Sequence, residues 1–584
     1  MNIQELDILN ILNCEEYTNQ RELSEISGHS VGVVNRSLKN LTEEGYIDEE
    51  VSLTEKAIEF CKENSPKNAV ILAAGYGMRM VPINTEIPKG LLTVKGERLI
   101  ERTIKQLKEV GVNNINIVVG FMKEKYEYLI EKYNVNLIVN EDYTTKNNLY
   151  SFNSALNVMG NTYIVPCDLW CRENPFKKSE TFSWYMMSDE IVEGSNVTIN
   201  RKKEIVKNIN LDEGNRMIGI SYILEKDLEV IKENVEYMIK HHRFNNVFWE
   251  DAAMVKNKMI FPAKTVKSSD YVEIDTYEQL RELDSDSKQL KTEAIDIIKE
   301  VLDARDDEIV NITTLKKGMT NRSFLFECKG EKYIMRIPGE GTDQLINRAE
   351  EASVYNQISD KNICDDIKFI DPSTGYKITK YFEGARCCDP LKEEDLEKCM
   401  AKLKDFHNLK LKVDHEFDIY GKMEFYETLW EGAPSVYEDY KHTKEKVYEL
   451  KQFIEDNIEE KSLTHIDAVP DNFLFVNVNG KEEIKLIDWE YSAMQDVHVD
   501  IAMFCIYALY DKEQCDHLID IYFEGNCPEN VRTKIYCYIA VCGLLWSNWC
   551  EYKRALGVDF GEYSIRQYRY AKEFYKYAVE RMDK

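Results

Sequence analysis

Residues 69–74 (AVILAA) form a continuous apolar segment that runs directly into a glycine-rich turn, GYGMR, at residues 75–79. Such a run, without polar alternation, is typical of a strand buried on both faces of a parallel sheet. Residues 99–110 then predict a helix, and residues 115–119, 137–140 and 162–166 predict further strands. This alternation predicts an α/β domain in the middle of the chain.

The chain has 584 residues, which is too many for one hydrophobic core. Two polar segments without apolar periodicity interrupt it, residues 62–68 (KENSPKN) and 283–292 (LDSDSKQLKT). We therefore predict three domains, at residues 1–64, 66–285 and 292–584.

Hydrophobic residues make up 43% of the chain and charged residues 31%, as in ordinary globular proteins. The longest apolar run, residues 537–546, is about half of a membrane span, and the N-terminus carries no signal pattern. The 15 cysteines show no disulfide framework. We expect a cytoplasmic protein with no membrane partner. A net charge of −29 disfavours nonspecific binding to nucleic acid and is compatible with a cationic substrate.

The first 62 residues predict three short helices, with Ser30 as the N-cap of the third, followed by a strand-like piece at residues 46–53. This order resembles the winged helix-turn-helix domains of bacterial regulators of the MarR type. Residues 1–64, however, contain five Lys or Arg against fourteen Asp or Glu, a net charge of −9. Because DNA recognition needs cations facing phosphates, we expect no nucleic-acid partner. Docking, sensing or assembly into a homo-oligomer remain open as roles.

The glycine-rich turn predicts a phosphate site. Backbone N–H groups around Gly75 and Gly77, with Ala73 and Ala74 just before them, can approach a nucleotide closely. Arg79 and Lys89 add the positive charge that a triphosphate and its leaving group require.

The ordered array of these residues with the segment PKGLL at 88–92 resembles the nucleoside-diphosphate-sugar pyrophosphorylase superfamily, whose signature is LAAGxGxRxxP…PKxLL. The resemblance implies a Rossmann-like mixed sheet that binds a nucleoside triphosphate. It also implies two metal-binding carboxylates, Asp168 at a strand end and Asp275 in an I-D-T segment, with Glu273 as the alternative to Asp275. Two carboxylates can hold Mg²⁺ against the α-phosphate.

Two further segments concern the acceptor. NNLYS at residues 147–151 and WED at 249–251 resemble the corresponding segments of bacterial CTP:phosphocholine cytidylyltransferases. The resemblance implies that phosphocholine contacts Asn148, Ser151, Trp249, Glu250 and Asp251. An aromatic ring beside acidic groups suits a quaternary ammonium. Tyr185 is a weaker candidate of the same kind, and plain core packing is the alternative for Trp249.

The last domain begins with short strands predicted at residues 312–315, 323–327 and 332–337 and a helix at 345–358. Later come HIDAVPDN at residues 465–472 and IKLIDWE at 484–490. The spacing H-x-D-x-x-x-x-N, followed by a strand ending in aspartate, predicts phosphoryl transfer. Asp467 would orient or deprotonate an acceptor hydroxyl, and Asn472 and Asp488 would bind Mg²⁺. His465 is expected to brace the loop.

This order resembles the choline/ethanolamine kinase family, which shares the two-lobed α+β protein-kinase-like fold. The resemblance implies that Arg336 takes the place of the ATP-binding lysine and that Glu351 is its helix partner, with Glu350 as the alternative. Ile466 departs from the family, because many members have Asn or Gly there. The residues that match the phosphate loop are Gly318, Thr320, Asn321 and Ser323.

Trp546 and Trp549 are three positions apart on a predicted helix and so face the same way. In the choline kinases, tryptophans at this position join a tyrosine, here Tyr491, around the trimethylammonium group. Tyr570 is a further candidate, and core packing is the alternative for the tryptophan pair.

Together the resemblances predict a bifunctional enzyme that phosphorylates choline with ATP and couples the phosphocholine to CTP, with Mg²⁺, to give CDP-choline. One alternative is an ethanolamine or sugar kinase fused to a matching nucleotidyltransferase. Another is a choline-responsive DNA-binding regulator with residual enzyme domains. The intact residues Asp467, Asn472, Asp488 and Asp168 argue against the regulator.

Overall fold

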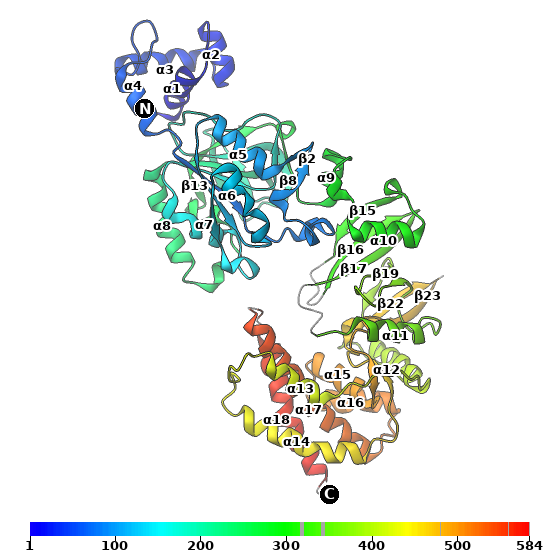
Figure 1. Ribbon diagram of the computed structural model, residues 1–584. Helices are drawn as coiled ribbons and strands as arrows, with labels where there is room; N and C mark the ends of the chain where they lie inside the picture. Colours follow the sequence, from blue (N-terminus) through cyan, green and yellow to red (C-terminus); the bar gives the residue numbers. More distant parts are fainter. Residues whose placement is uncertain (316–320, 340–344, 479, 557, 559, 583–584) are drawn as a thin grey trace. The chain divides into compact units, whose positions relative to one another are not determined.

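The computed structural model describes residues 1–315, 321–339, 345–478, 480–556, 558 and 560–582 (Figure 1). The chain divides into two compact units, Met1–Ile295 and Asp296–Lys584. The first unit holds both the N-terminal helices and the α/β sheet. Two of the predicted phosphate-loop residues, Gly318 and Thr320, lie outside the described residues.

Four helices form the N-terminal part: α1 (Ile3–Cys14), α2 (Gln20–Ser27), α3 (Val31–Glu43) and α4 (Glu55–Glu63). Ser30 caps α3 as predicted, because its side chain accepts the backbone N–H of Val33. The predicted strand at residues 46–53 is reduced to a single bridge between Ile47 and Leu53. Asp48 accepts two backbone N–H groups within the turn, which tightens it before a longer ladder can form.

Helix α1 lies against a loop of the α/β part of the same unit. The hydroxyl of Ser179 donates to Asn10 Oδ1 at 3.2 Å, and the hydroxyl of Thr181 donates to the carbonyl of Leu6 at 3.1 Å. Both hydroxyl residues are buried. The winged helix is therefore docked on the α/β domain.

The α/β domain is built on a ten-stranded mixed sheet with the order β5-β4-β1-β6-β11-β8-β13-β10-β9, and β12 pairs with β13. Strands β5, β4, β1 and β6 are parallel. The strands are β1 (Asn68–Ala73), β4 (Asn114–Val119), β5 (Asn136–Val139), β6 (Thr162–Pro166), β8 (Trp184–Glu193), β9 (Val197–Ile199), β10 (Glu204–Lys207), β11 (Glu213–Ile223), β12 (Met254–Val255) and β13 (Lys258–Val266). The predicted strands and the Rossmann-like mixed sheet are confirmed.

Both faces of β1 are buried, which explains its unbroken apolar sequence. Ile71 packs in one core with Ile104, and Val70 packs in a second core with Phe152 and Leu228. The covering helices are α5 (Leu99–Glu109), α6 (Tyr128–Tyr133), α7 (Asn148–Ala155) and α8 (Glu225–Met238).

A small ladder outside the main sheet brings distant acidic residues together. Strand β7 (Leu169–Cys171) pairs antiparallel with β14 (Tyr271–Glu273), and the backbone N–H of Ile274 donates to the carbonyl of Asp168. Because β7 follows β6 directly, this pairing carries the I-D-T segment to the carboxyl end of the parallel strands. Helix α9 (Tyr277–Leu283) follows, and the small hairpin of β2 (Thr93–Val94) and β3 (Glu97–Arg98) precedes α5.

The second unit begins with a five-stranded antiparallel sheet of order β15-β16-β17-β19-β18. Its strands are β15 (Ile309–Thr314), β16 (Asn321–Cys328), β17 (Glu331–Pro338), β18 (Ile367–Ile370) and β19 (Lys377–Lys380), with α10 (Glu293–Leu302) and α11 (Arg348–Ile358) beside them. Helix α11 starts three residues later than predicted, because the Asn347 side chain caps it by accepting two backbone N–H groups.

The rest of this unit is mainly helical, which gives the predicted two-lobed α+β fold. Its helices are α12 (Glu393–Asn408), α13 (Ile419–Thr428), α14 (Tyr440–Asp456), α15 (His498–Tyr507), α16 (Lys512–Phe523), α17 (Glu529–Ala555) and α18 (Glu562–Met582). Its strands are β20 (Arg386–Cys387), β21 (Ser462–Thr464), β22 (Phe473–Val478), β23 (Lys481–Leu486) and β24 (Ala493–Gln495). Among the described helices, α17 included, none combines the length and apolarity needed to cross a bilayer.

Two candidate active sites

A cavity of about 650 Å³ opens at the carboxyl ends of β1 and β6. Every residue that the sequence predicted for this domain lines it: Ala73, Ala74, Gly75, Gly77, Arg79, Lys89, Asn148, Ser151, Asp168, Trp249, Glu250, Asp251 and Asp275. The two predicted groups, for nucleotide and for acceptor, therefore share one space.

Gly77 is a glycine for two physical reasons. Its φ of +59° lies in the left-handed region, and a Cβ there would come within 2.8 Å of Lys89 Cγ. The turn thus holds the lysine side chain directly against the backbone after β1, so the positive charge is close to the N–H groups that a phosphate would meet.

Three carboxylates gather at one side of this cavity. Ligand oxygens of Asp168, Glu273 and Asp275 lie within 4.8 Å of one another. Lys89 Nζ lies 3.0 Å from Asp168 Oδ2 and also donates to Asp275, while Arg79 Nη2 lies 2.8 Å from Asp275 Oδ2. Oxygen donors gathered this closely fit a divalent cation such as Mg²⁺. Glu273, the predicted alternative to Asp275, thus lies beside it rather than replacing it.

The pKa values in this cluster reflect burial and the charges of the neighbouring groups. Burial would lower the pKa of Lys89, but the carboxylates of Asp168 and Asp275 outweigh it and raise that pKa above its usual value. Burial, followed by the charges of Asp275 and Asp168, raises the pKa of Glu273 to about 7. The cluster therefore needs nearby cations, which Lys89 and Arg79 supply here.

At the acceptor end, Trp249 is 1% exposed and stacks on Phe152 with ring centroids 4.8 Å apart. Its backbone N–H donates to Asn148 Oδ1 at 2.9 Å, so Asn148 positions the WED segment. The Tyr185 hydroxyl donates to Glu250 Oε1 at 2.9 Å, whereas Glu250 Oε2 has no hydrogen-bond partner among the described residues. Burial raises the pKa of Glu250 to about 7.

At the same end of the cavity, Ser151 and Asp251 each have a polar partner. The hydroxyl of Ser151 accepts a hydrogen bond from Asn140 Nδ2 at 3.0 Å. Lys207 Nζ lies 2.5 Å from Asp251 Oδ1, and Lys207 also lines the cavity. Sequence reasoning missed Lys207, although alternation in β10 gave a signal, since Lys207 shares a strand face with the fully buried Ile205.

A second cavity, of about 570 Å³, lies in the second unit between its sheet and its helical part. Among the described residues, those predicted from sequence that line it are Ser323, Arg336, Asp467, Asn472, Asp488, Tyr491, Trp546 and Trp549. Glu351 lies behind Arg336, outside the lining. Asn321 begins β16.

Arg336 is held by Glu351. Two hydrogen bonds, Nη1 to Oε1 at 2.6 Å and Nη2 to Oε2 at 2.7 Å, join them, while the alternative partner Glu350 is half-exposed. Burial would raise the pKa of Glu351, but Arg336 and Lys377 bring it down to about 2. The pair fixes the guanidinium at the cavity wall.

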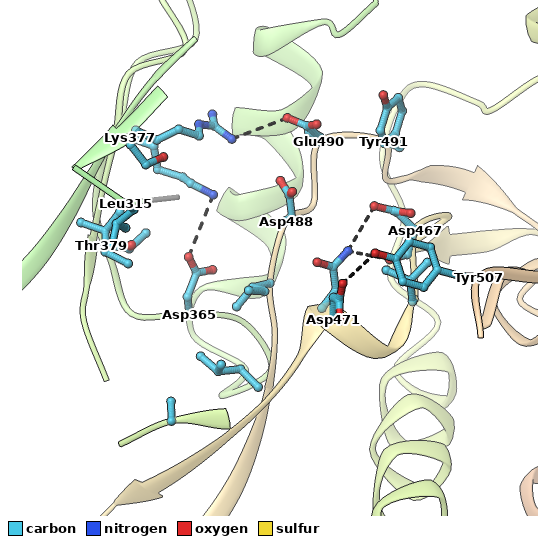
Figure 2. Close-up of a pocket in the computed structure, with 18 of the residues that line it drawn as sticks. Leu315, Asp365, Lys377, Thr379, Asp467, Asp471, Asp488, Glu490, Tyr491 and Tyr507 are labelled. Atoms are coloured by element: carbon cyan, nitrogen blue, oxygen red, sulfur yellow. Dashed lines mark hydrogen bonds and ion pairs between the residues drawn. The ribbon is translucent and has the colours of Figure 1, made fainter. Parts of the chain in front are cut away.

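Asp467 lies with Asp488 and Glu490 around this cavity (Figure 2). Asn472 Nδ2 donates to Asp467 Oδ2 at 3.1 Å and to its carbonyl at 2.9 Å, which fixes the carboxylate. Burial, then the charges of Asp488 and Glu490, raise the pKa of Asp467 to about 8. In its ionised form, a carboxylate with such a pKa is a stronger base than an ordinary aspartate and can take a proton from a hydroxyl.

The backbone before Asp467 is strained. Ile466 has a φ of +68°, in the left-handed region that a β-branched residue rarely adopts. Asp500 compensates, because its Oδ1 accepts the N–H of Ile466 at 2.7 Å and its Oδ2 accepts that of His465 at 3.1 Å. His465 Nε2 also lies 3.0 Å from the carbonyl of Ile487, which suits a bracing role.

Aromatic rings form the other end of the cavity. Tyr491 and Trp546 meet edge-on with centroids 5.7 Å apart, and Trp546 and Trp549 do so at 5.6 Å. Tyr507 and Tyr563, which sequence reasoning missed, also line it. These five aromatic rings line a space that suits a quaternary ammonium group, which is attracted to ring faces.

The suggestion that Tyr570 joins this cage is wrong. Tyr570 is 3% exposed, does not line the cavity, and donates its hydroxyl to the carbonyl of Tyr510. Its position on α18 turns it into the helical core.

These two cavities define a bifunctional enzyme, with a nucleotidyltransferase site in the first unit and a small-molecule kinase site in the second. A choline-phosphate cytidylyltransferase of Streptococcus pneumoniae is 31% identical over 227 residues, covering 37% of this chain and 96% of the relative. The chain belongs to this cytidylyltransferase family through its middle domain.

Family models agree with the order of the domains. The model for choline/ethanolamine kinase matches residues 312–541, that for MobA-like NTP transferase domains matches 69–175, and that for winged helix-turn-helix DNA-binding matches 1–48. Protein LicA of Haemophilus influenzae is 26% identical over 261 residues, covering 43% of this chain and 96% of the relative. A crystal structure of choline kinase LicA from Streptococcus pneumoniae is 26% identical, covers 48% of this chain and 97% of that chain, and has a TM-score of 0.42. The family models and the cytidylyltransferase relative confirm the predicted order of a winged helix, a nucleotidyltransferase domain and a kinase domain, and with it the predicted bifunctional enzyme.

Proposed function

We propose that the chain makes CDP-choline from choline in two steps. The kinase site phosphorylates choline with ATP, and the nucleotidyltransferase site joins the phosphocholine to CTP and releases pyrophosphate. The observation that carries this proposal is the aromatic end of the kinase cavity, where Tyr491, Trp546 and Trp549 lie in one lining with Asp467. A trimethylammonium group has no N–H to donate, so ring faces suit it better than polar acceptors.

In the kinase site, Asp467 takes the proton of the choline hydroxyl as the oxygen attacks the γ-phosphate of ATP and ADP leaves. Asn472 keeps that carboxylate oriented. Arg336, fixed by Glu351, contributes positive charge toward the nucleotide phosphates. Asn472 and Asp488 would hold Mg²⁺, which supplies charge neutralisation on the phosphates.

In the nucleotidyltransferase site, a phosphate oxygen of phosphocholine attacks the α-phosphate of CTP and pyrophosphate leaves. Lys89 and Arg79 are placed to stabilise the negative charge on the transferring and leaving groups. Asp168, Glu273 and Asp275 would hold Mg²⁺ at the α-phosphate, where it supplies further neutralisation.

Ethanolamine is the second candidate acceptor. Glu250 Oε2 has no partner among the described residues, and an ammonium with N–H groups would satisfy it. We favour choline because the kinase cavity offers several rings to the cation.

We infer that the enzyme works in the cytoplasm, where its substrates ATP and CTP are available. The acidic winged helix argues against nucleic acid and leaves assembly into a homo-oligomer as one role for that domain.

In the deciding experiment, the full chain is incubated with choline, ATP, CTP and MgCl₂, and the formation of CDP-choline is measured by mass spectrometry. Omitting CTP should make phosphocholine accumulate, and omitting ATP should stop both products. Parallel reactions with ethanolamine or with sugars test the other acceptors. Turnover of one of those, with none of choline, would replace this proposal.

A further inference from the structure

Lys207 projects into the acceptor end of the nucleotidyltransferase cavity. It is the last residue of β10, on the strand face that also carries the fully buried Ile205, so its side chain points inward. Its backbone N–H donates to the carbonyl of Asn257 at 2.8 Å, which fixes the strand end. Its Nζ lies 2.5 Å from Asp251 Oδ1.

The ion pair changes the charge that an incoming cation meets. Lys207 already neutralises Asp251, and both side chains are about 30% exposed (30% and 28%), so the pair is partly shielded from solvent. Glu250 is the other carboxylate of this segment, and burial favours its protonated form, with a pKa of about 7. Where Glu250 is protonated, below pH about 7, a bare cation therefore finds little unmatched negative charge on this segment.

Free choline does not readily displace the Lys207 ammonium from Asp251. Lys207 and Asp251 are held in one cavity, so their pairing is intramolecular and competes at a high effective concentration. Free choline brings only a second cation and gives Lys207 no new partner. Phosphocholine brings a phosphate, and a lysine on its flexible four-carbon chain can move to it.

We propose that Lys207 is a specificity-determining residue that makes this site discriminate phosphocholine from free choline. The acceptor phosphate draws the Lys207 ammonium from Asp251 and so frees that carboxylate for the trimethylammonium group. This inference rests on the proposed function. Such discrimination matters in this chain, because its kinase site needs free choline in the same solution.

The test measures cytidylyl transfer to phosphocholine without ATP, in an Asp467→Ala background that silences the kinase, with free choline as inhibitor. The readout is the ratio of the choline Ki to the phosphocholine KM. Lys207→Met should lower this ratio about tenfold, the equivalent of 1.4 kcal/mol, by strengthening choline inhibition and weakening phosphocholine binding. Lys207→Gln, which keeps a polar end, should lower it in the same direction.

Two controls complete the test. Lys207→Arg keeps the charge and should retain the original ratio. Lys202→Met removes an exposed lysine outside the cavity lining and should leave the ratio unchanged. An unchanged ratio in both Lys207→Met and Lys207→Gln overturns the inference. Absence of CDP-choline with the unsubstituted transferase site would instead overturn the proposed function.

Discussion

Arg336 and Glu351 face each other through two parallel charge-assisted hydrogen bonds of 2.6 and 2.7 Å, with side chains 6% and 0% exposed. The arginine comes from β17 and the glutamate from α11. This fork geometry needs a guanidinium, because a lysine ammonium cannot bond both carboxylate oxygens in parallel. The pair therefore ties the position of α11 to a charged group in the lining of the kinase cavity.

Glu351→Gln should destabilise the kinase domain by about 3 kcal/mol, because it leaves a buried guanidinium without its main counter-charge. The KM for ATP should rise about tenfold, while cytidylyl transfer stays unchanged. Glu350→Gln, one residue away and half-exposed, is the control. Melting curves and ATP titrations that match this control would contradict the role given to Glu351.

Single substitutions should separate the two activities. Asp467→Ala should abolish phosphorylation of choline yet leave CDP-choline formation from added phosphocholine intact. Asp168→Ala should do the reverse, so that phosphocholine accumulates. Loss of a group that acts in the transition state typically lowers kcat by a factor of about 10² to 10⁴. Mass analysis of both products checks each variant, and kinase turnover at the original rate in Asp467→Ala would show that the base lies elsewhere.

Trp546→Ala and Trp549→Ala should raise the choline KM of the kinase about tenfold, with a much smaller change in the ATP KM. Each substitution removes one wall of an aromatic cage worth about 1–2 kcal/mol to a desolvated cation. Trp430→Ala is the matched control, since Trp430 is half-buried outside the cavity lining. Equal damage to both KM values, together with a lower melting temperature, would mean that the pair serves the core.

The elements that sequence predicted well are those set by local pattern. The apolar run before Gly75 predicted β1, because few other structures bury six such residues in a row. The catalytic loop from His465 to Asn472 has its functional groups close together in sequence, so its spacing alone brought Asp467 near Asn472. Ser30 marked a helix start by its own hydrogen bond.

The remaining features depend on partners far along the chain. Lys207 enters the acceptor site only through the register of β10 on β13. Ile466 adopts its left-handed conformation because Asp500, 34 residues later, accepts its N–H. The sequence offered Tyr570 as a candidate, but which residues of α18 meet the cavity depends on how that helix packs, and Tyr563 lines it instead. Such non-local choices are set by tertiary packing, and local alternation such as that in β10 gives only a weak signal of them.

Phosphocholine binding at the nucleotidyltransferase site should weaken as pH falls through 7. Burial raises the pKa of Glu250 to about 7, and only its ionised form attracts a cation. Acidification protonates that carboxylate, so the KM for phosphocholine should rise about fourfold between pH 8.5 and pH 6.5, with most of the rise below pH 7. The range from pH 6.5 to 8.5 stays above the second phosphate pKa of about 6. Glu250→Gln should have a high KM that is flat over this range, and an unchanged pH profile in that variant would exclude Glu250 as the titrating group.

The charge of the winged helix opposes DNA binding, while its contacts with the α/β domain favour a structural role. Arg36 and Lys39 are exposed on α3, but Lys39 pairs with Glu43 at 3.7 Å, and residues 48–50 (DEE) place exposed acidic side chains on the wing. Two cations release too few counterions to overcome a net charge of −9, so the full chain should not shift duplex DNA at micromolar protein and physiological salt. Deletion of residues 1–64 should spare both activities. It should lower the melting temperature of the nucleotidyltransferase domain, because buried hydroxyl groups that now bond α1 lose their partners. Salt-sensitive, sequence-selective binding below micromolar, lost in an Arg36→Ala, Lys39→Ala double variant, would instead make the enzyme a DNA-binding regulator as well.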